Sequence, residues 1–123
     1  KIGTKMNTRK SRIWLSYDLG LKGDFPGLYR FLDNQDAQEI GNSSATFMFE
    51  TQAEDDEGVL RALETKIKEV MEVDKNTRLY VVCASKDQNG AITRVYGKLL
   101  NGRRKSNPWK GYGDSDAAEY DGE

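Results

Sequence analysis

The stretch that decides the fold is Arg12-Ile13-Trp14-Leu15-Ser16-Tyr17-Asp18, an apolar, β-prone run that stops at a single carboxylate. Glycines follow closely, at Gly20 and Gly23. Branched and aromatic side chains favour extended backbone, whereas aspartate and glycine favour turns. The sequence therefore predicts a buried strand over residues 13–19, with Asp18 at its carboxyl edge.

Two segments have the spacing of amphipathic helices. The first follows Asp24, a residue type that commonly caps helices, carries Pro26 in its first turn and runs to about residue 33. The second covers residues 57–73, where apolar side chains recur at helical spacing and charged side chains occupy the other face. We expect each helix to bury one face against a sheet.

Four further segments are predicted to be strands. Residues 37–40 and 45–51 flank a Gly-Asn-Ser-Ser turn and predict a hairpin. Residues 78–85 have the continuous apolar centre of a central strand. Residues 92–100 follow the turn Asp87-Gln88-Asn89-Gly90, in which Asn-Gly is a strong hairpin signal.

This order of elements predicts an α+β fold, a ferredoxin-like βαββαβ sandwich with an additional C-terminal strand. Its sheet is antiparallel, and both helices lie on one face. The other face then needs a cover, from the tail, the extra strand or a second copy of the chain. Ile13, Leu15 or Trp14 on that face would favour a homodimer, and the extra strand offers an edge for pairing between subunits.

The formal net charge of −1 conceals an uneven distribution. Residues 1–12 carry five basic groups and no acid, and residues 101–112 carry four and no acid. The tail from Gly113 carries five acids and no base. We expect a flexible basic arm over 1–11, a ferredoxin-like domain over 12–100, and a basic-aromatic segment with an acidic tail over 101–123.

The residue counts narrow the chemistry. The chain has no histidine, which disfavours serine-hydrolase triads, papain-like dyads and ordinary zinc sites. Cys83 is the only cysteine and has apolar neighbours, which predicts a buried, reduced thiol and a cytoplasmic protein. No apolar run approaches the roughly 20 residues that cross a bilayer, so no membrane partner is expected.

The strand ending in Ser16-Tyr17-Asp18-Leu19, then a loop, then Leu28-Tyr29 opening a helix, resembles small Cas2-like families. These are the smaller integrase subunit of CRISPR adaptation, SinR-like proteins and virulence-associated protein D. The likeness covers about residues 12–100 and implies a homodimer with a ferredoxin-like core. In some members, strand-end aspartates of two subunits hold a divalent metal for phosphodiester cleavage. Here only Asp18 matches that role. The chain departs from the family pattern in having no second acid in the strand-end motif, a low pI and a long tail after Leu100, and these departures count against nuclease activity.

Asp18 is the sharpest candidate for a catalytic and metal-binding residue. One aspartate from each subunit, placed across a two-fold axis, can bridge Mg²⁺ or Mn²⁺ beside a phosphate. The alternative is that Asp18 caps the following loop through backbone contacts.

The second candidate is the basic and aromatic segment after the last strand. Its cations suit phosphates, and its aromatic rings can stack on bases. The candidate nucleic-acid-binding residues are Arg103, Arg104, Lys105, Trp109, Lys110 and Tyr112. The alternative is a tail anchored by Pro108 and Trp109 on the open sheet face, with its charged groups in solvent.

The sequence favours a small homodimeric Cas2-like protein that binds nucleic acid, with metal-dependent nuclease activity as the strongest form of this hypothesis. An alternative is a non-catalytic module that binds a protein or a nucleotide, such as a phage or host defence regulator. The slightly negative net charge favours this alternative over general affinity for nucleic acid. A third hypothesis is a structural subunit that only dimerises.

Overall fold

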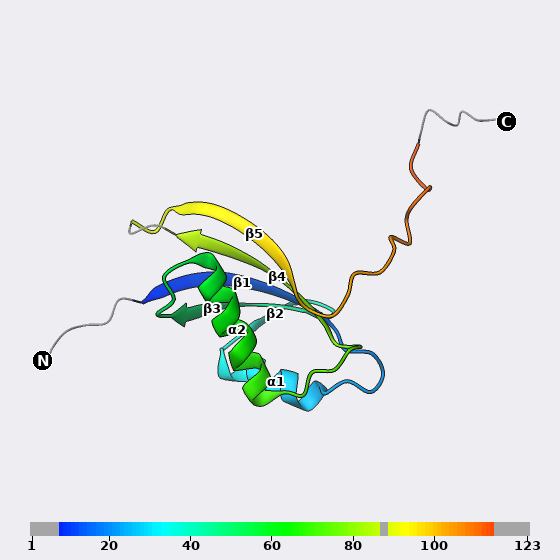
Figure 1. Cartoon of the computed structure of the whole chain (residues 1–123), viewed down its shortest axis with the longest axis horizontal. Coiled ribbons are helices and arrows are strands. Elements are labelled where there is room, and N and C mark those ends of the chain that lie inside the picture. Colours follow the sequence, from blue (N-terminus) through cyan, green and yellow to red (C-terminus); the bar gives the residue numbers. More distant parts are fainter. Residues whose placement is uncertain (1–7, 87–88, 115–123) are drawn as a thin grey trace, which may run out of the picture.

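The strands of the chain form one antiparallel sheet (Figure 1). The structure is a computed structural model, and it describes residues 8–86 and 89–114. The strands of the sheet lie in the order β2-β3-β1-β4-β5. The described elements are β1 (Arg9–Asp18), α1 (Phe25–Asn34), β2 (Gln38–Gly41), β3 (Ser44–Thr51), α2 (Asp56–Val70), β4 (Arg78–Lys86) and β5 (Ile92–Asn101). The predicted α+β class is confirmed, with five strands and two helices in the described residues.

Both helices begin at aspartate caps. The side chain of Asp24 accepts a hydrogen bond from the backbone of Gly27 at 3.0 Å, as the sequence predicted for α1. Asp55 caps α2 in the same way and accepts from Gly58 at 2.8 Å. The helix α2 ends three residues before its predicted end, because the backbone of Met71 is already extended.

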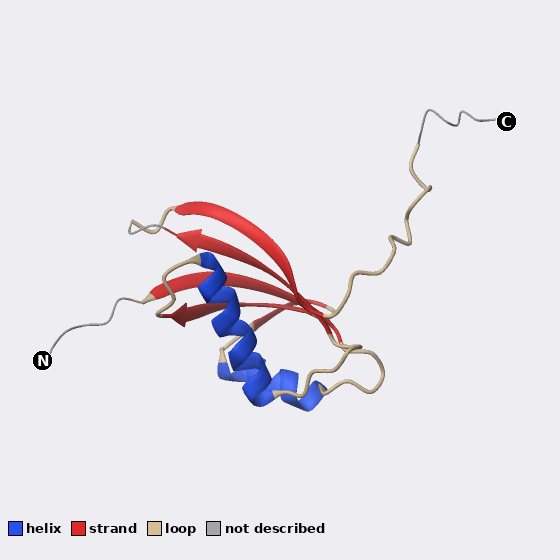
Figure 2. Ribbon diagram, viewed as in Figure 1, coloured by secondary structure: helices blue, strands red, loops and turns tan. Residues whose placement is uncertain are grey.

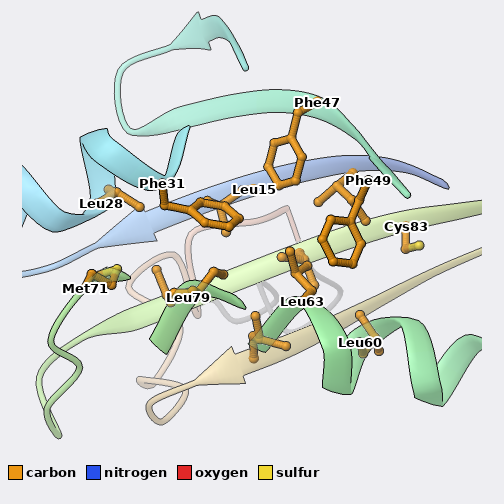
Figure 3. Close-up of a cluster of buried hydrophobic side chains, with 14 of the residues drawn as sticks. Leu15, Leu28, Phe31, Phe47, Phe49, Leu60, Leu63, Met71, Leu79 and Cys83 are labelled. Atoms are coloured by element: carbon orange, nitrogen blue, oxygen red, sulfur yellow. The ribbon is translucent and has the colours of Figure 1, made fainter. Parts of the chain in front are cut away.

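The two helices cover the same face of the sheet (Figure 2). Their apolar residues pack onto the inward-facing residues of β1, β3 and β4 in a single cluster (Figure 3). At its centre the rings of Phe31 in α1 and Phe47 in β3 meet edge to face, with 5.6 Å between their centroids. Such aromatic pairs contribute about 0.5–1.5 kcal/mol to stability, in addition to the contribution from burial of their apolar surface. The described core therefore joins every layer of the fold.

The opposite face of the sheet is open among the described residues. Alternation along β1 buries Ile13 and Leu15 under the helices and leaves Trp14 on the open face, 37% exposed. Tyr80 of β4 and Val95 of β5 are also exposed there, at 45% and 58%. Of the three residues considered for this face, only Trp14 occupies it, because strand residues alternate in direction.

The strand β1 begins four residues before the start predicted for it. Its early residues pair with the end of β3, Arg9 opposite Thr51, so they belong to the sheet rather than to an arm. The remaining predicted arm, residues 1–7, lies outside the described residues, as do the predicted acidic tail from 115 onward and the turn residues 87 and 88.

An ionic cluster fastens the sheet to α2 at the end away from Asp18. The carboxylate of Asp56, in the first turn of α2, accepts a hydrogen bond from Ser85 of β4 at 2.6 Å. It also forms ion pairs with Arg9 of β1 at 3.4 Å and Arg94 of β5 at 3.1 Å. One carboxylate thus links the helix to three strands.

Cys83 is buried, as the sequence predicted, and burial raises the pKa of its thiol. Both helices of the described residues are too short or too polar to span a membrane.

Candidate functional site

The site lies where β1 and β4 meet at one end of the sheet. Asp18, the last residue of β1, is paired across the strands with Arg78, the first residue of β4. A terminal nitrogen of the Arg78 guanidinium donates to Oδ2 of Asp18 at 3.0 Å. The other carboxylate oxygen, Oδ1, accepts from the backbone N–H of Gly20 at 3.3 Å. Both oxygens of Asp18 are therefore engaged within the chain.

These contacts set the charge state of Asp18. The hydrogen bond from Arg78 is the main cause that lowers the pKa of this carboxyl, and the backbone of Gly20 and the charge of Lys105 act in the same direction. The Asp18 side chain is half exposed, so the ion pair is screened by solvent. Asp18 is ionised at neutral pH and lies among positive charges.

A rigid turn brings further polar groups to Arg78. In the turn after α2, the carboxylate of Asp74 accepts hydrogen bonds from the backbone of Asn76 at 2.8 Å and the hydroxyl of Thr77 at 3.1 Å. Thr77 is 1% exposed, so the turn is anchored in the protein. These bonds fix the backbone that carries Lys75 and Asn76.

The end of β5 is tied to the same turn. The side chain of Asn101 donates to the backbone oxygen of Thr77 at 2.7 Å. The next residue, Gly102, has a φ of +94°, and a Cβ there would lie 2.7 Å from the oxygen of Thr77 and 2.8 Å from Cγ of Arg78. Only glycine fits this conformation and this close approach. The chain therefore leaves β5 directly beside Arg78.

This geometry forms a concave site that we call the cationic pocket. It has a volume of about 570 Å³, within the range of small-ligand pockets. Two segments far apart in sequence supply its positive charges, and Asp18 supplies the one carboxylate. The pocket is lined by Asp18, Gly20, Lys75, Asn76, Arg78, Arg103, Arg104 and Lys105. Five cations around one carboxylate give a local positive charge on a chain whose net charge is −1.

A second pocket adjoins the first and shares three of its residues, Arg78, Arg104 and Lys105. We call it the Trp109 pocket; its volume is about 540 Å³, and its other lining residues are 106–109. Backbone bonds shape this part of the tail, from Lys110 to Asn107 at 3.1 Å and from Tyr112 to Trp109 at 3.0 Å. An aromatic ring therefore lies beside a group of cations.

The structure brings together some of the predicted site residues and not others. Arg103, Arg104 and Lys105 lie beside Asp18 in the cationic pocket, and Trp109 lines the adjoining one. Lys110 and Tyr112 line neither pocket, and Tyr112 is 85% exposed.

The tail does not anchor on the open sheet face. Trp109 is 67% exposed, and residues 102–114 run away from the sheet (Figure 1). Since Pro108 and Trp109 leave that face open, the predicted anchor is wrong for the described residues. The aromatic ring remains accessible to a ligand.

Sequence reasoning missed Lys75, Asn76 and Arg78 as members of the site. The segment Asp74-Lys75-Asn76 looked only like the end of a helix, and Arg78 looked like the polar start of a strand. The sequence did contain one signal for Arg78. In an antiparallel pair the end of one strand lies opposite the start of its neighbour, so an arginine that begins one central strand can face an aspartate that ends the other.

The described side chains of a single chain do not fit a divalent cation. They contain no group of three or more carboxylate or thiolate residues that could hold a metal. Among the described residues, Asp18 is the only carboxylate that lines the cationic pocket, and the positive charges around it oppose a cation. The pocket instead suits an anion.

Comparison of this chain with models of protein families, with curated proteins and with solved structures found no match.

Proposed function

We propose that this chain binds nucleic acid through the cationic pocket and the Trp109 pocket. The observation that carries the proposal is the convergence of Lys75, Arg78 and residues 103–105 on one concavity beside an exposed indole. Arginine and lysine donate charge-assisted hydrogen bonds to phosphate oxygens, and an indole stacks on any base. The acidic net charge of the chain does not oppose this binding, because the local charge is positive.

The fold that we propose for this function is ferredoxin-like. The strand order β2-β3-β1-β4, with helices after β1 and after β3, supports this assignment. The strand β5 adds to the outer edge of β4, in accordance with an extra C-terminal strand. The same order supports the proposed relationship to Cas2-like proteins, which also rests on the Tyr17-Asp18 ending of β1.

A homodimer formed through the open sheet face is part of the proposal. Trp14 of β1 lies next to Val82 of β4, and the Tyr80 ring crosses to Gly97 of β5, where a Cβ would meet its hydroxyl. An accessible apolar surface of this kind is typical of protein interfaces. Burial of this face by a second copy would remove Trp14, Tyr80 and Val95 from water.

The dimer is tested by light scattering coupled to size exclusion. Val95→Lys places a charge on the open face at an exposed position, so it should yield a monomer that keeps its fold by circular dichroism. Thr65→Lys, on the exposed side of α2, is the control and should remain dimeric. A wild-type monomer at all concentrations would exclude the dimer.

Nucleic-acid binding is tested by fluorescence anisotropy with labelled single-stranded DNA and RNA. Replacement of Arg103, Arg104 and Lys105 by alanine should weaken binding at least about tenfold and reduce its salt dependence, because three phosphate contacts are lost. Lys66→Ala, on the exposed face of α2, is the control for charge and should bind like the wild type. Absence of binding by the wild-type protein at low salt would contradict the proposal.

Metal-dependent cleavage is the extended form of this proposal. It requires Asp18 to leave Arg78 and to meet the Asp18 of a second subunit, since one chain offers a single carboxylate there. Incubation of wild type and Asp18→Ala with RNA or DNA in Mg²⁺ or Mn²⁺ tests it. Cleavage that is lost in Asp18→Ala supports it, and equal cleavage or none removes Asp18 from a catalytic role.

The open face also supports a second candidate function, a module that binds another protein. Trp14 and Tyr80 are the kind of aromatic residue that anchors protein interfaces. Isolation of the protein from its native cells as a complex of two different chains, lost in Val95→Lys, would favour this function over a homodimer.

A further inference from the structure

We propose that the two adjoining pockets bind the phosphorylated end of a nucleic-acid strand, with the terminal phosphate in the cationic pocket and the last base against Trp109. This inference rests on the proposed nucleic-acid binding and narrows it from a strand in general to its end. Four observations support it: the number of charges, the junction of the pockets, the position of Asp18 and the bonding of Arg78.

The number of charges suits a terminal phosphate. A phosphate monoester carries about −1.5 to −2 at neutral pH, whereas an internal diester carries a single negative charge. The cationic pocket gathers five cations from two separate segments around one concavity. A compact group of cations matches a dianion better than it matches an extended backbone of evenly spaced single charges.

The junction of the pockets gives the strand a path toward the indole. Arg78, Arg104 and Lys105 line both pockets, so a phosphate held by these three residues lies beside the Trp109 pocket. Each pocket, at about 570 and 540 Å³, has the size of a small-ligand site. One phosphate and one nucleoside can therefore occupy neighbouring pockets.

Asp18 disfavours a strand that continues through the cationic pocket. It lines the cationic pocket but not the Trp109 pocket, and it is hydrogen-bonded to Arg78, which lines both. A strand that continued past the first phosphate in this pocket would bring a second phosphate toward an ionised carboxylate. Repulsion between the two anions disfavours this path, and the bound phosphate is then the end group.

Arg78 has a hydrogen-bond donor that Asp18 does not use. Its Nε is buried and has no hydrogen-bond partner among the described residues, and one terminal nitrogen donates to Asp18. A phosphate that replaces Asp18 offers three acceptor oxygens, which allow the two-pronged contact that guanidinium groups favour. The free protein thus holds Arg78 by a carboxylate that a dianion can displace.

The experiment compares strands of one sequence that differ only at their ends. The full-length protein is titrated against single-stranded oligonucleotides, labelled on an internal base, that carry a 5′-phosphate, a 3′-phosphate or hydroxyls at both ends. We expect a preference of about tenfold for one phosphorylated end over the hydroxyl ends, as a gain of charge-assisted contacts predicts. The 5′ and 3′ strands distinguish which end is bound.

Two variants assign the preference to the pockets. Lys105→Ala should reduce it to about twofold or less, because one cation at the junction is lost, and Trp109→Ala should weaken all strands by about tenfold through loss of stacking. Lys66→Ala is the control and should retain the preference. Both pocket variants change exposed residues, so circular dichroism should show an intact fold.

Each outcome has a distinct meaning. Equal affinity for phosphorylated and hydroxyl ends overturns the inference and leaves nucleic-acid binding in place. A preference that persists in Lys105→Ala places the end elsewhere and also overturns the inference. Absence of binding to every strand overturns both the inference and the proposed function.

Discussion

Asp18 and Arg78 lie opposite each other at the ends of β1 and β4, with 3.0 Å between a guanidinium nitrogen and a carboxylate oxygen. Sixty residues separate them in sequence, so the register of the two central strands alone creates the pair. Both side chains line the cationic pocket. In the function that we propose, Asp18 is an internal anion that competes with a phosphate for Arg78.

Asp18→Asn should tighten oligonucleotide binding. The substitution removes the negative charge that faces Lys105 and occupies Arg78, so the affinity should rise about fivefold, equivalent to about 1 kcal/mol. Fluorescence anisotropy with single-stranded DNA measures the change. Asp33→Asn, an equivalent change on the exposed face of α1, is the control and should have no effect. Weaker binding by Asp18→Asn would mean that the carboxylate helps to hold the ligand.

Gly102→Ala should reduce both stability and binding. Its φ of +94° and the 2.7 Å approach of a Cβ to the oxygen of Thr77 predict a loss of about 1–3 kcal/mol in the free energy of unfolding. The displaced chain would also carry Arg103 and Arg104 away from Arg78, which should weaken oligonucleotide binding about fivefold or more.

Gly90→Ala is the matched control for Gly102→Ala. Its φ is +83°, but no atom of the described residues lies within 4 Å of a Cβ built there. The free energy of unfolding of Gly90→Ala should therefore fall by about 1 kcal/mol because of backbone strain, and the variant should bind oligonucleotides like the wild type. Urea unfolding and anisotropy measure the two quantities, and equal binding by both alanine variants would contradict the positioning role of Gly102.

The contribution of Asp24 to stability should depend on pH. The backbone N–H groups of Glu72 and Gly27 donate to its carboxylate and lower its pKa in the folded state. The unfolded chain binds the proton more tightly, so the stabilisation is complete above about pH 4 and is lost as the pH falls through the folded pKa.

Comparison with Asp24→Asn measures that contribution, because asparagine can still accept the capping hydrogen bond. The wild type should be the more stable protein at pH 7 in urea unfolding, and the difference should shrink as the pH falls below about 4. A difference that is the same at pH 7 and at pH 3 would show that the charge of Asp24 contributes nothing.

Asp56→Ala should destabilise the fold by about 2 kcal/mol, since it removes charge-assisted contacts to three strands. Its side chain is 20% exposed, which limits screening by solvent. Glu57→Ala is the control in the same helical turn, because its ion pair with Arg61 is long, at 3.8 Å, and exposed. It should cost less than about 0.5 kcal/mol by urea unfolding, and equal losses would contradict the linking role of Asp56.

Local patterns predicted most of the elements and the core. The cap at Asp24 and the spacing of Leu28 and Phe31 fixed where α1 begins and which face it buries. Boundaries were less accurate where pairing decides them, as at Arg9, which joins β1 because Thr51 of β3 lies opposite. A residue with no apolar neighbours shows its strand character only through its partner.

The candidate site was predicted in part. Asp18 and the cations at 103–105 were identified, since a carboxylate at a strand end and a basic run are visible in a single segment. Lys75 and Arg78 were not, because their importance comes from neighbours distant in sequence. The alternative considered for Trp109, an anchor on the open sheet face, is wrong because β5 ends at Asn101 and the turn at Gly102 directs the tail away from that face.

The sequence by itself determined the α+β class and the alternation that buries Ile13 and Leu15, because propensity, capping and periodicity act over a few neighbouring residues. The tertiary structure decided that Asp18 meets Arg78 and that two basic segments share one pocket. These contacts between distant segments depend on the strand register and on the direction of the turn at Gly102. Both are specified only when the sheet is packed.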